Sequence, residues 1–157
     1  MEADFKDMLV ALINEEVDYL LIGAHAMAVH GCPRATGDID FWVRATPENS
    51  RRVHRALTSF GAPTGEITPD YFAKDGPGFQ VGLPPLRIDI LTKISGVDFE
   101  EAWPSRLSHD EEGIPVSVIG RDDLLANKKA SGRPKDLSDV RMLEKPPKTR
   151  RPPAVSE

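Results

Sequence analysis

Three aspartates stand out because they occur in stretches that are otherwise typical of buried β-strands. Asp38 and Asp40 open the apolar run in "TGDIDFWV", residues 36–43, and Asp89 interrupts the aliphatic run "LRIDILT", residues 86–92. Side chains alternate along a strand that rises about 3.3 Å per residue, so Asp38 and Asp40 emerge on one face about 7 Å apart. Burial of a carboxylate without compensation raises its pKa and costs free energy, so we expect a positive group between them.

The residue types leave three forms of compensation open: an arginine, a solvent-facing sheet edge, or a divalent cation that prefers oxygen ligands, such as Mg²⁺. If the strand of Asp89 lies beside the strand of Asp38 and Asp40, three acids share one patch and repel each other unless cations bind. Two metal ions about 3.5–4 Å apart, held by shared carboxylates, are a common arrangement for in-line displacement at phosphorus. In the alternative, each acid pairs with a nearby arginine: Arg34, Arg44 or Arg87.

A glycine turn upstream of the acids is a candidate phosphate site. In "LLIGAHAMA", residues 20–28, Gly23 separates an apolar strand from a helix. The free N–H groups at a helix N-terminus and the positive end of its dipole attract phosphate. A glycine at such a junction is often only a turn. The motif gains weight because the strand with Asp38 and Asp40 follows closely in the sequence.

Positive charge near these motifs is expected from the C-terminal part of the chain. In "DDLLANKKASG", Lys128 follows the two leucines at helical spacing, whereas Lys129 is rotated away by about 100°. We expect Lys128 to point inward, where it would stabilise charge on a leaving pyrophosphate, or else to extend to water. Arg133 lies in the turn "GRPKD" and is a candidate phosphate contact or a surface residue. Asp136 is placed to pair with it or to cap the next helix.

The elements that must position these residues alternate between helices and strands. Apolar runs bounded by glycine, proline and polar residues predict the strands, and apolar positions three and four residues apart predict the helices. The mixed order indicates an α+β fold, with helices packed on a mixed β-sheet. Strands are expected at 17–23, 38–43, 86–92 and 114–120, with an edge strand near 78–82 in a long loop over 62–85, and helices at 5–13 with Asp4 as its cap, 24–31, 46–60, 122–132 and 134–144.

Length and composition predict one domain and a tail. The 157 residues, 39% hydrophobic, suffice for one core, so we expect a single domain over 1–144 and a basic, proline-rich, disordered tail over 145–157. The net charge of −5 argues against broad binding of duplex nucleic acid. The lack of a long apolar run or signal peptide predicts a cytoplasmic protein without a membrane partner. The single cysteine, Cys32, excludes an internal disulfide and a thiolate zinc cluster.

The order of the motifs resembles that of the minimal nucleotidyltransferases of the polymerase-β superfamily. In that family a strand ends in Gly-Gly or Gly-Ser at a helix start, the next strand carries Asp-x-Asp, and a later strand carries one more Asp. Here "IGAHA", "DID" and "IDI" hold these places. The stretches "GAHAMAVHGCPRATGDIDF" and "LLANKKASGRPKDLSDVRML" also resemble the AbiEii-type branch, which is associated with toxin–antitoxin and phage-defence systems. The resemblance covers residues 17–143 and implies a nucleotidyltransferase fold.

The resemblance implies transfer of a nucleoside monophosphate from a nucleoside triphosphate (NTP) to a hydroxyl of RNA, such as a tRNA 3′ end, or of a partner protein. Asp38 and Asp40 would hold Mg²⁺ on the triphosphate, and Asp89 would ligate a second Mg²⁺ and help to deprotonate the acceptor. The amides around Gly23 and Ala24 would bind phosphate, although Ala24 replaces the usual glycine or serine and so lacks a hydroxyl contact. The alternatives are an antitoxin-like module that binds nucleotide or a partner without turnover, and a metal-dependent phosphodiesterase.

Overall fold

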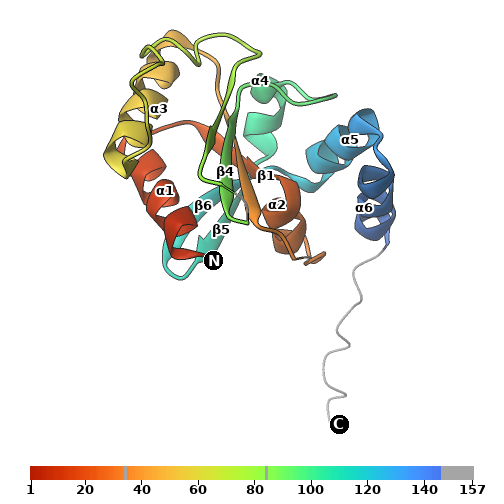
Figure 1. Ribbon diagram of the computed structural model, residues 1–157. Coiled ribbons are helices and arrows are strands. Elements are labelled where there is room, and N and C mark those ends of the chain that lie inside the picture. Colours follow the sequence, from red (N-terminus) through yellow and green to blue (C-terminus); the bar gives the residue numbers. More distant parts are fainter. Residues whose placement is uncertain (34, 84, 146–157) are drawn as a thin grey trace.

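The computed structural model describes residues 1–33, 35–83 and 85–145, and in these residues a six-stranded mixed sheet forms the centre of the molecule (Figure 1). The strand order is β3-β4-β2-β1-β6-β5. Strand β2 pairs in parallel with β4, and β1 with β6, while the other neighbours are antiparallel. The predicted mixed sheet of an α+β fold is therefore confirmed. The strands are β1 Tyr19–Ile22, β2 Asp38–Val43, β3 Gly78–Val81, β4 Arg87–Leu91, β5 Leu107–Glu111 and β6 Ile114–Val118.

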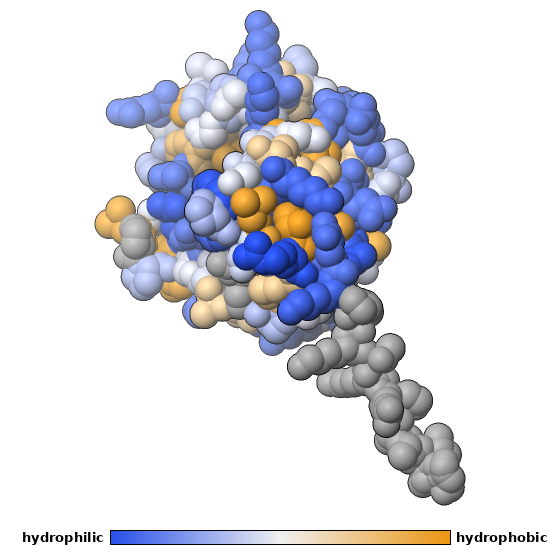
Figure 2. Space-filling view, turned by 90° about the vertical axis from the view of Figure 1, so that its right-hand side faces the viewer, coloured by the Kyte–Doolittle hydropathy of each residue, from blue (hydrophilic) through white to orange (hydrophobic). Residues whose placement is uncertain are grey.

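Helices cover both faces of the sheet. Helices α1 and α3 pack against each other on one side, and the hairpin of α5 and α6 lies on the opposite side (Figure 1). The face that carries α5 and α6 is mostly hydrophilic around a smaller apolar area (Figure 2). The helices are α1 Ala3–Asn14, α2 Gly23–Val29, α3 Pro47–Phe60, α4 Phe99–Ala102, α5 Arg121–Ser131 and α6 Pro134–Glu144, and a 3₁₀ turn, η1, covers Trp103–Ser105.

The helix ends follow local sequence signals in α3 but not in α1. Thr46 caps α3 by accepting a hydrogen bond from the Asn49 backbone N–H at 3.2 Å, and Pro47 occupies the first turn. The prediction that Asp4 caps α1 is wrong. The helix begins before the apolar stripe that marks it in the sequence, so Glu2 is the N-cap residue and has no side-chain cap bond. Asp4 instead lies in the first turn, where a carboxylate still interacts favourably with the helix dipole.

Each predicted strand and helix is present, with bounds that differ by at most two residues, but β5 and α4 were not predicted. Strand β5 forms a hairpin with β6, in which Glu111 pairs with Ile114 across the turn residues Glu112 and Gly113. Both turn residues have positive φ, as a tight two-residue hairpin requires. The sequence "LSHDE" carries too few apolar residues to mark a strand, so the pairing with β6 decides its conformation.

The alternation of side chains along β2 separates the core from the site. Ile39, Phe41 and Val43 are fully buried, whereas Asp38 and Asp40, which lie on the other face, are only half-buried. No helix within the described ranges is long and apolar enough to cross a membrane. The predicted tail begins at residue 145, and residues 146–157 lie outside the described residues, so the division into a domain and a tail stays a prediction.

Candidate active site

The parallel pairing of β2 and β4 brings the three predicted acids together. In this register Asp40 lies opposite Asp89, and Asp38 lies opposite Arg87. Residues opposite each other on neighbouring strands point to the same face of a sheet, and so do residues two apart on one strand. The side chains of Asp40 and Asp89 also share a hydrogen bond. The strand of Asp89 therefore lies beside the strand of Asp38 and Asp40, as the three-acid arrangement requires.

Asp40 is the acid with the most perturbed environment. Burial raises the pKa of its carboxyl, and the hydrogen bond and charge of Asp89 and the charge of Asp38 add to this effect, so that the pKa reaches about 7. The positive charge of Lys128 opposes the shift but does not cancel it. The raised pKa therefore comes first from burial and second from the neighbouring acids.

Arg87 contacts two of the three acids. Its Nη2 donates a hydrogen bond to Asp38 Oδ2 at 3.2 Å, and its Nε lies 3.4 Å from Asp89 Oδ1. The atoms of this second contact are both buried, and neither has a hydrogen-bond partner. The contact is therefore an ion pair without a hydrogen bond. Arginine compensation, the alternative left open by the sequence, thus applies to Asp38 and Asp89. No ion pair of Asp40 occurs within 4 Å among the described residues.

The other two arginines named from the sequence, Arg34 and Arg44, are not seen to pair with the three acids among the described residues. Arg44 lies just beyond the opposite end of β2, where it pairs with Asp18 at 3.0 Å and with Glu100. It is therefore not a partner of the three acids. Arg34 lies outside the described residues.

The start of α2 is held directly against Asp40. Gly23 opens the helix with φ +70°, and a Cβ at this position would lie 2.3 Å from Asp40 Oδ2. Glycine is therefore needed here both for the left-handed backbone and for the close approach of the carboxylate. Ala24 follows in the first turn and lines the same cavity. The junction is thus more than a turn, because it packs the helix start onto one of the acids.

Lys128 points inward, as the helical spacing predicts, and its exposed fraction is 7%. Its Nζ lies 3.0 Å from Asp139 Oδ2 and 3.6 Å from Asp136 Oδ1, and both acids belong to α6. The alternative of a side chain that extends to water is therefore wrong. The reason is that α6 supplies two buried carboxylates, which compensate a lysine charge inside the protein.

Arg133 stands at the turn between α5 and α6, and its side chain is largely exposed. Its Nε donates to Asp136 Oδ2 at 2.7 Å, and its backbone N–H reaches the same oxygen at 3.3 Å. Asp136 thus both pairs with Arg133 and caps α6, the two roles that the sequence left open. The guanidinium of Arg133 is held at the rim of the site by this pair.

All the predicted site residues line one open cavity of about 380 Å³. The acids form part of its wall on the sheet, and the α5–α6 hairpin forms the opposite part. Sequence reasoning missed Lys93 of the lining and considered Arg87 only as one of three possible arginine partners of the acids. Arg87 carried a usable signal, because it lies two residues before Asp89 and so on the same face of β4. The predicted residues in the lining are Gly23, Ala24, Asp38, Asp40, Asp89, Lys128 and Arg133.

The three acids offer the type of ligand atom that Mg²⁺ prefers, but their side chains are not arranged around a common point. Within the described part of the chain, no group of three or more His, Cys, Asp or Glu side chains is placed to hold a metal ion. The donors are nevertheless all carboxylate oxygens, the ligands that Mg²⁺ prefers. One of them, Asp89 Oδ1, is buried without a hydrogen bond, and Asp40 faces Asp89 with no ion-pair partner within 4 Å among the described residues. A divalent cation would relieve both features.

The sequence matches the family described as "Nucleotidyltransferase of unknown function (DUF6036)" over residues 2–144. The chain belongs to this nucleotidyltransferase family. The predicted enzyme class, nucleotidyltransferase, is confirmed at the level of the family. The AbiEii-type branch is a finer assignment and stays a prediction. No curated protein matches the chain.

Solved structures with the same fold include several nucleotidyltransferases. A candidate nucleotidyltransferase from Thermotoga maritima has a TM-score of 0.59 and 15% identity over 88% of both chains. The antibiotic-resistance factor ANT(2'')-Ia, crystallised with adenylyl-2''-tobramycin, has a TM-score of 0.58 and 14% identity over 88% of this chain and 84% of its own. A nucleotidyltransferase-like antigen from Paracoccidioides brasiliensis has a TM-score of 0.53 and 18% identity, covering 89% and 74%. At such identities the likeness establishes the fold alone.

Proposed function

We propose that this protein transfers a nucleoside monophosphate from an NTP to a hydroxyl acceptor, with Asp38, Asp40 and Asp89 as the acids of the reaction. The observation that carries the proposal is the pairing of Asp40 with Asp89 in one wall of an open cavity, against the glycine that starts α2. Within a nucleotidyltransferase family, two facing carboxylates, of which Asp40 has a raised pKa, are the expected place for phosphoryl chemistry.

In the proposed reaction the acceptor oxygen forms a bond to the α-phosphorus, the bond from that phosphorus to pyrophosphate breaks, and the hydroxyl proton passes to Asp89. Asp38 and Asp40 would hold Mg²⁺ on the triphosphate, and Asp89 would hold a second ion. Bound Mg²⁺ would neutralise charge on the acids and on the phosphates. The backbone N–H groups at Gly23 and Ala24 would orient the phosphates, because they lie at a helix start beside the acids.

The cations of the α5–α6 hairpin would bind the departing end of the triphosphate. Lys128 reaches the cavity wall although Asp136 and Asp139 already hold it, so it would act as a fixed charge beside the phosphates. Arg133 stands at the rim and would contact phosphate with the part of its guanidinium that Asp136 leaves free. Replacement of Lys128 by alanine should weaken the binding of NTP, and equal affinity would assign Lys128 to the packing of the hairpin alone.

We further propose that the acceptor is RNA, such as a tRNA 3′ end, or a partner protein, within a toxin–antitoxin system of the AbiEii type. The motif order "GAHAMAVHGCPRATGDIDF" and "LLANKKASGRPKDLSDVRML" supports this assignment. Lys93 and Lys135 line the cavity, are exposed, and have no ion-pair partner among the described residues, so they are available to an anionic acceptor. The ANT(2'')-Ia structure contains adenylyl-2''-tobramycin, and its low identity with this chain does not carry that acceptor over.

A second candidate function is the binding of nucleotide or of a partner without turnover. Ala24 favours it, because no side-chain hydroxyl is available at the predicted phosphate site. This function predicts that NTP raises the thermal midpoint of the protein while no pyrophosphate is released. Transfer with release of pyrophosphate would exclude it.

The decisive experiment is incubation with each labelled NTP and Mg²⁺, together with total RNA or with cell protein, to find which fraction acquires the label. The Asp38→Asn and Asp89→Asn variants are expected to lose the transfer and to keep the fold by circular dichroism. If both variants transfer label at the rate of the unchanged protein, the assignment of these acids is wrong.

A further inference from the structure

Arg87 occupies the place between two of the proposed metal-binding acids. It lies opposite Asp38 in the pairing of β2 with β4, and it lies two residues before Asp89 on the same strand. Both neighbours share its face of the sheet, so one side chain reaches both carboxylates. An arginine guanidinium carries a fixed positive charge, so it compensates the negative charge of these two carboxylates. The sequence offered Arg87 as one of three possible partners of the acids, and the strand order shows which two acids it reaches.

The contacts of Arg87 are those of an exchangeable cation. The closer contact, to Asp38, measures 3.2 Å, and the contact to Asp89 at 3.4 Å leaves a buried donor and a buried acceptor without hydrogen bonds. Charge-assisted hydrogen bonds of arginine normally measure about 2.7–2.9 Å and are often bidentate. The Arg87 side chain is 31% exposed, so water and ligands reach it. An arginine with a purely structural role would be expected to satisfy these groups.

The position of Arg87 also accounts for the lack of a ready metal site. Asp38 and Asp89 both turn to the guanidinium, and within the described ranges no three acidic or histidine side chains are placed around a common point. No arginine or lysine lies within ion-pair distance of Asp40 in the described part of the chain. The positive charge of Arg87 is therefore shared between two of the three acids.

We propose that Arg87 is a stand-in cation: a divalent ion displaces it from Asp38 and Asp89, and the released guanidinium then binds a phosphate of the nucleotide. The inference rests on the proposed function, because it takes these acids as ligands of the metal ions. Arg87 lines the same cavity as Gly23 and Lys128, so the guanidinium remains beside the triphosphate after it leaves the acids. Arg87 is a positioning residue for the metal ions and a direct ligand of the phosphate.

The proposal predicts two opposite effects of one substitution. In Arg87→Met, which keeps much of the side-chain length and removes the charge, Mn²⁺ alone should bind more tightly by about threefold or more, because its competitor is gone. Tripolyphosphate in the presence of Mn²⁺ should bind more weakly by about threefold or more, because a charged ligand of phosphate is lost. Arg87→Lys keeps the charge and should bind Mn²⁺ alone as the unchanged protein does.

The measurement is a titration of free Mn²⁺ by its electron paramagnetic resonance signal, which reports the bound ion independently of activity and of stability. Tripolyphosphate binding is measured by calorimetry at saturating Mn²⁺. Arg51→Met is the matched control, since this exposed arginine of α3 pairs with Asp70, away from the cavity. It should change neither affinity.

The outcomes separate this inference from the proposed function. Tighter Mn²⁺ binding and weaker tripolyphosphate binding by Arg87→Met support it. Equal Mn²⁺ affinity of Arg87→Met and the unchanged protein overturns it, while the acids remain a metal site. If Asp89→Asn binds Mn²⁺ as tightly as the unchanged protein, the acids are not the metal ligands and the proposed function fails with the inference. A loss of folded protein in Arg87→Met, with unchanged Mn²⁺ affinity in Arg87→Gln, also overturns it.

Discussion

The two ends of strand β2 carry charged groups that differ in how far neighbouring residues compensate their charge. At the start of the strand, Asp38 and Asp40 face a third acid, and burial together with the neighbouring charges raises the pKa of Asp40 to about 7. Just past the other end, Arg44 is surrounded by partners that satisfy its charge and its backbone. The same short strand therefore connects a cluster of acids that Arg87 compensates only in part with a cluster whose charges are paired.

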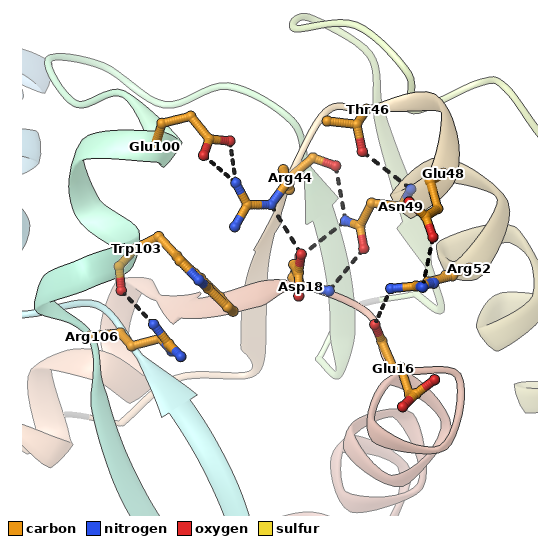
Figure 3. Close-up of polar contacts among 10 residues, drawn as sticks. All are labelled: Glu16, Asp18, Arg44, Thr46, Glu48, Asn49, Arg52, Glu100, Trp103 and Arg106. Carbon is orange, nitrogen blue, oxygen red and sulfur yellow. Dashed lines mark hydrogen bonds and ion pairs between the residues drawn. The ribbon is translucent and has the colours of Figure 1, made fainter.

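The compensated end is a network centred on Arg44 and Asn49 (Figure 3). The guanidinium of Arg44 pairs with Asp18 and Glu100 and lies 4.9 Å from the ring centre of Phe99, while its side chain is 17% exposed. The buried amide of Asn49 donates to the Arg44 carbonyl at 2.9 Å and accepts from the Asp18 N–H at 2.8 Å. These bonds tie the start of α3 to β1 and β2. In this network the charged and polar groups are satisfied by the protein itself.

The difference indicates where a bound ion or substrate would find unsatisfied groups. Buried polar groups in folded proteins are generally satisfied, so a cluster that is not satisfied by the protein itself is a candidate for a bound ion or substrate. The acid end of β2 meets this criterion, and the arginine end does not. The variants below alter one end at a time.

The largest effect is expected for Asp40→Asn. The rate of Mg²⁺-dependent transfer should fall by about 1,000-fold or more, because one ligand of the proposed metal site is lost. At pH 8 the free energy of unfolding should rise, because a buried, repelled charge has been removed. Transfer is measured with labelled NTP, and stability by denaturant unfolding without metal. A normal transfer rate would make Asp40 an ordinary buried acid.

Asn49→Ala should have the opposite profile. It leaves the Asp18 N–H and two carbonyls near a buried site without their partner, so the free energy of unfolding should fall by about 2–3 kcal/mol. The transfer rate per folded molecule should not change. Asn14→Ala, at the exposed end of α1, is the control and should remain within about 0.5 kcal/mol. An equal effect of the two variants would mean that the network adds little to stability.

The stability of the metal-free protein should depend on pH because of Asp40. Its pKa is raised from 3.8 to about 7 on folding, so the folded state binds the proton more tightly than the unfolded state. The contribution is fully present below about pH 4 and is lost as the pH rises to about 7, and its size is on the order of 4 kcal/mol, at about 1.4 kcal/mol for each pKa unit. Denaturant unfolding at several pH values measures it. The same slope in Asp40→Asn would assign the pH dependence to other groups.

The smallest effect is expected from two glycine substitutions that differ only in their surroundings. Gly31→Ala places a Cβ in open space at φ +89° and should cost about 1 kcal/mol, because only the backbone is strained. Gly23→Ala adds a Cβ that would lie 2.3 Å from Asp40 Oδ2, so it should cost roughly 1 kcal/mol more. Thermal unfolding compares the two. Equal losses would show that the carboxylate moves away freely, and that the contact between α2 and Asp40 is loose.

Much of the fold was predictable, because local patterns coincide with tertiary burial. The apolar run of β1, the helix with Thr46 and Pro47 at its start, and the strand interrupted by Asp89 were each marked by residue periodicity and end signals. Strand β5 was not predictable, because its residues are mostly polar and only its pairing with β6 makes it a strand. The prediction of the cap residue of α1 was wrong for a similar reason, because local sequence specifies helix ends only weakly.

The predicted site residues share a cavity because the sequence marked them by chemical contrast: acids within apolar strands, a glycine before a helix, and a lysine on an apolar face. The interaction partners of these residues were harder to predict from the sequence. Asp139 was not connected with Lys128, because the relevant spacing spans two helices and a turn. Arg87 was only one of three candidate arginines until the strand order was known.

The sequence by itself determined most of the element types, the candidate residues for phosphoryl chemistry, and the resemblance that pointed to a nucleotidyltransferase. Those properties follow from local periodicity and side-chain chemistry, which any short window of the chain contains. The tertiary structure alone decided that Asp40 faces Asp89, that Arg87 serves two of the acids, and that Lys128 is held by α6. These pairings join residues far apart in the chain, and a charge acquires its pKa and its partner only when folding has fixed its neighbours.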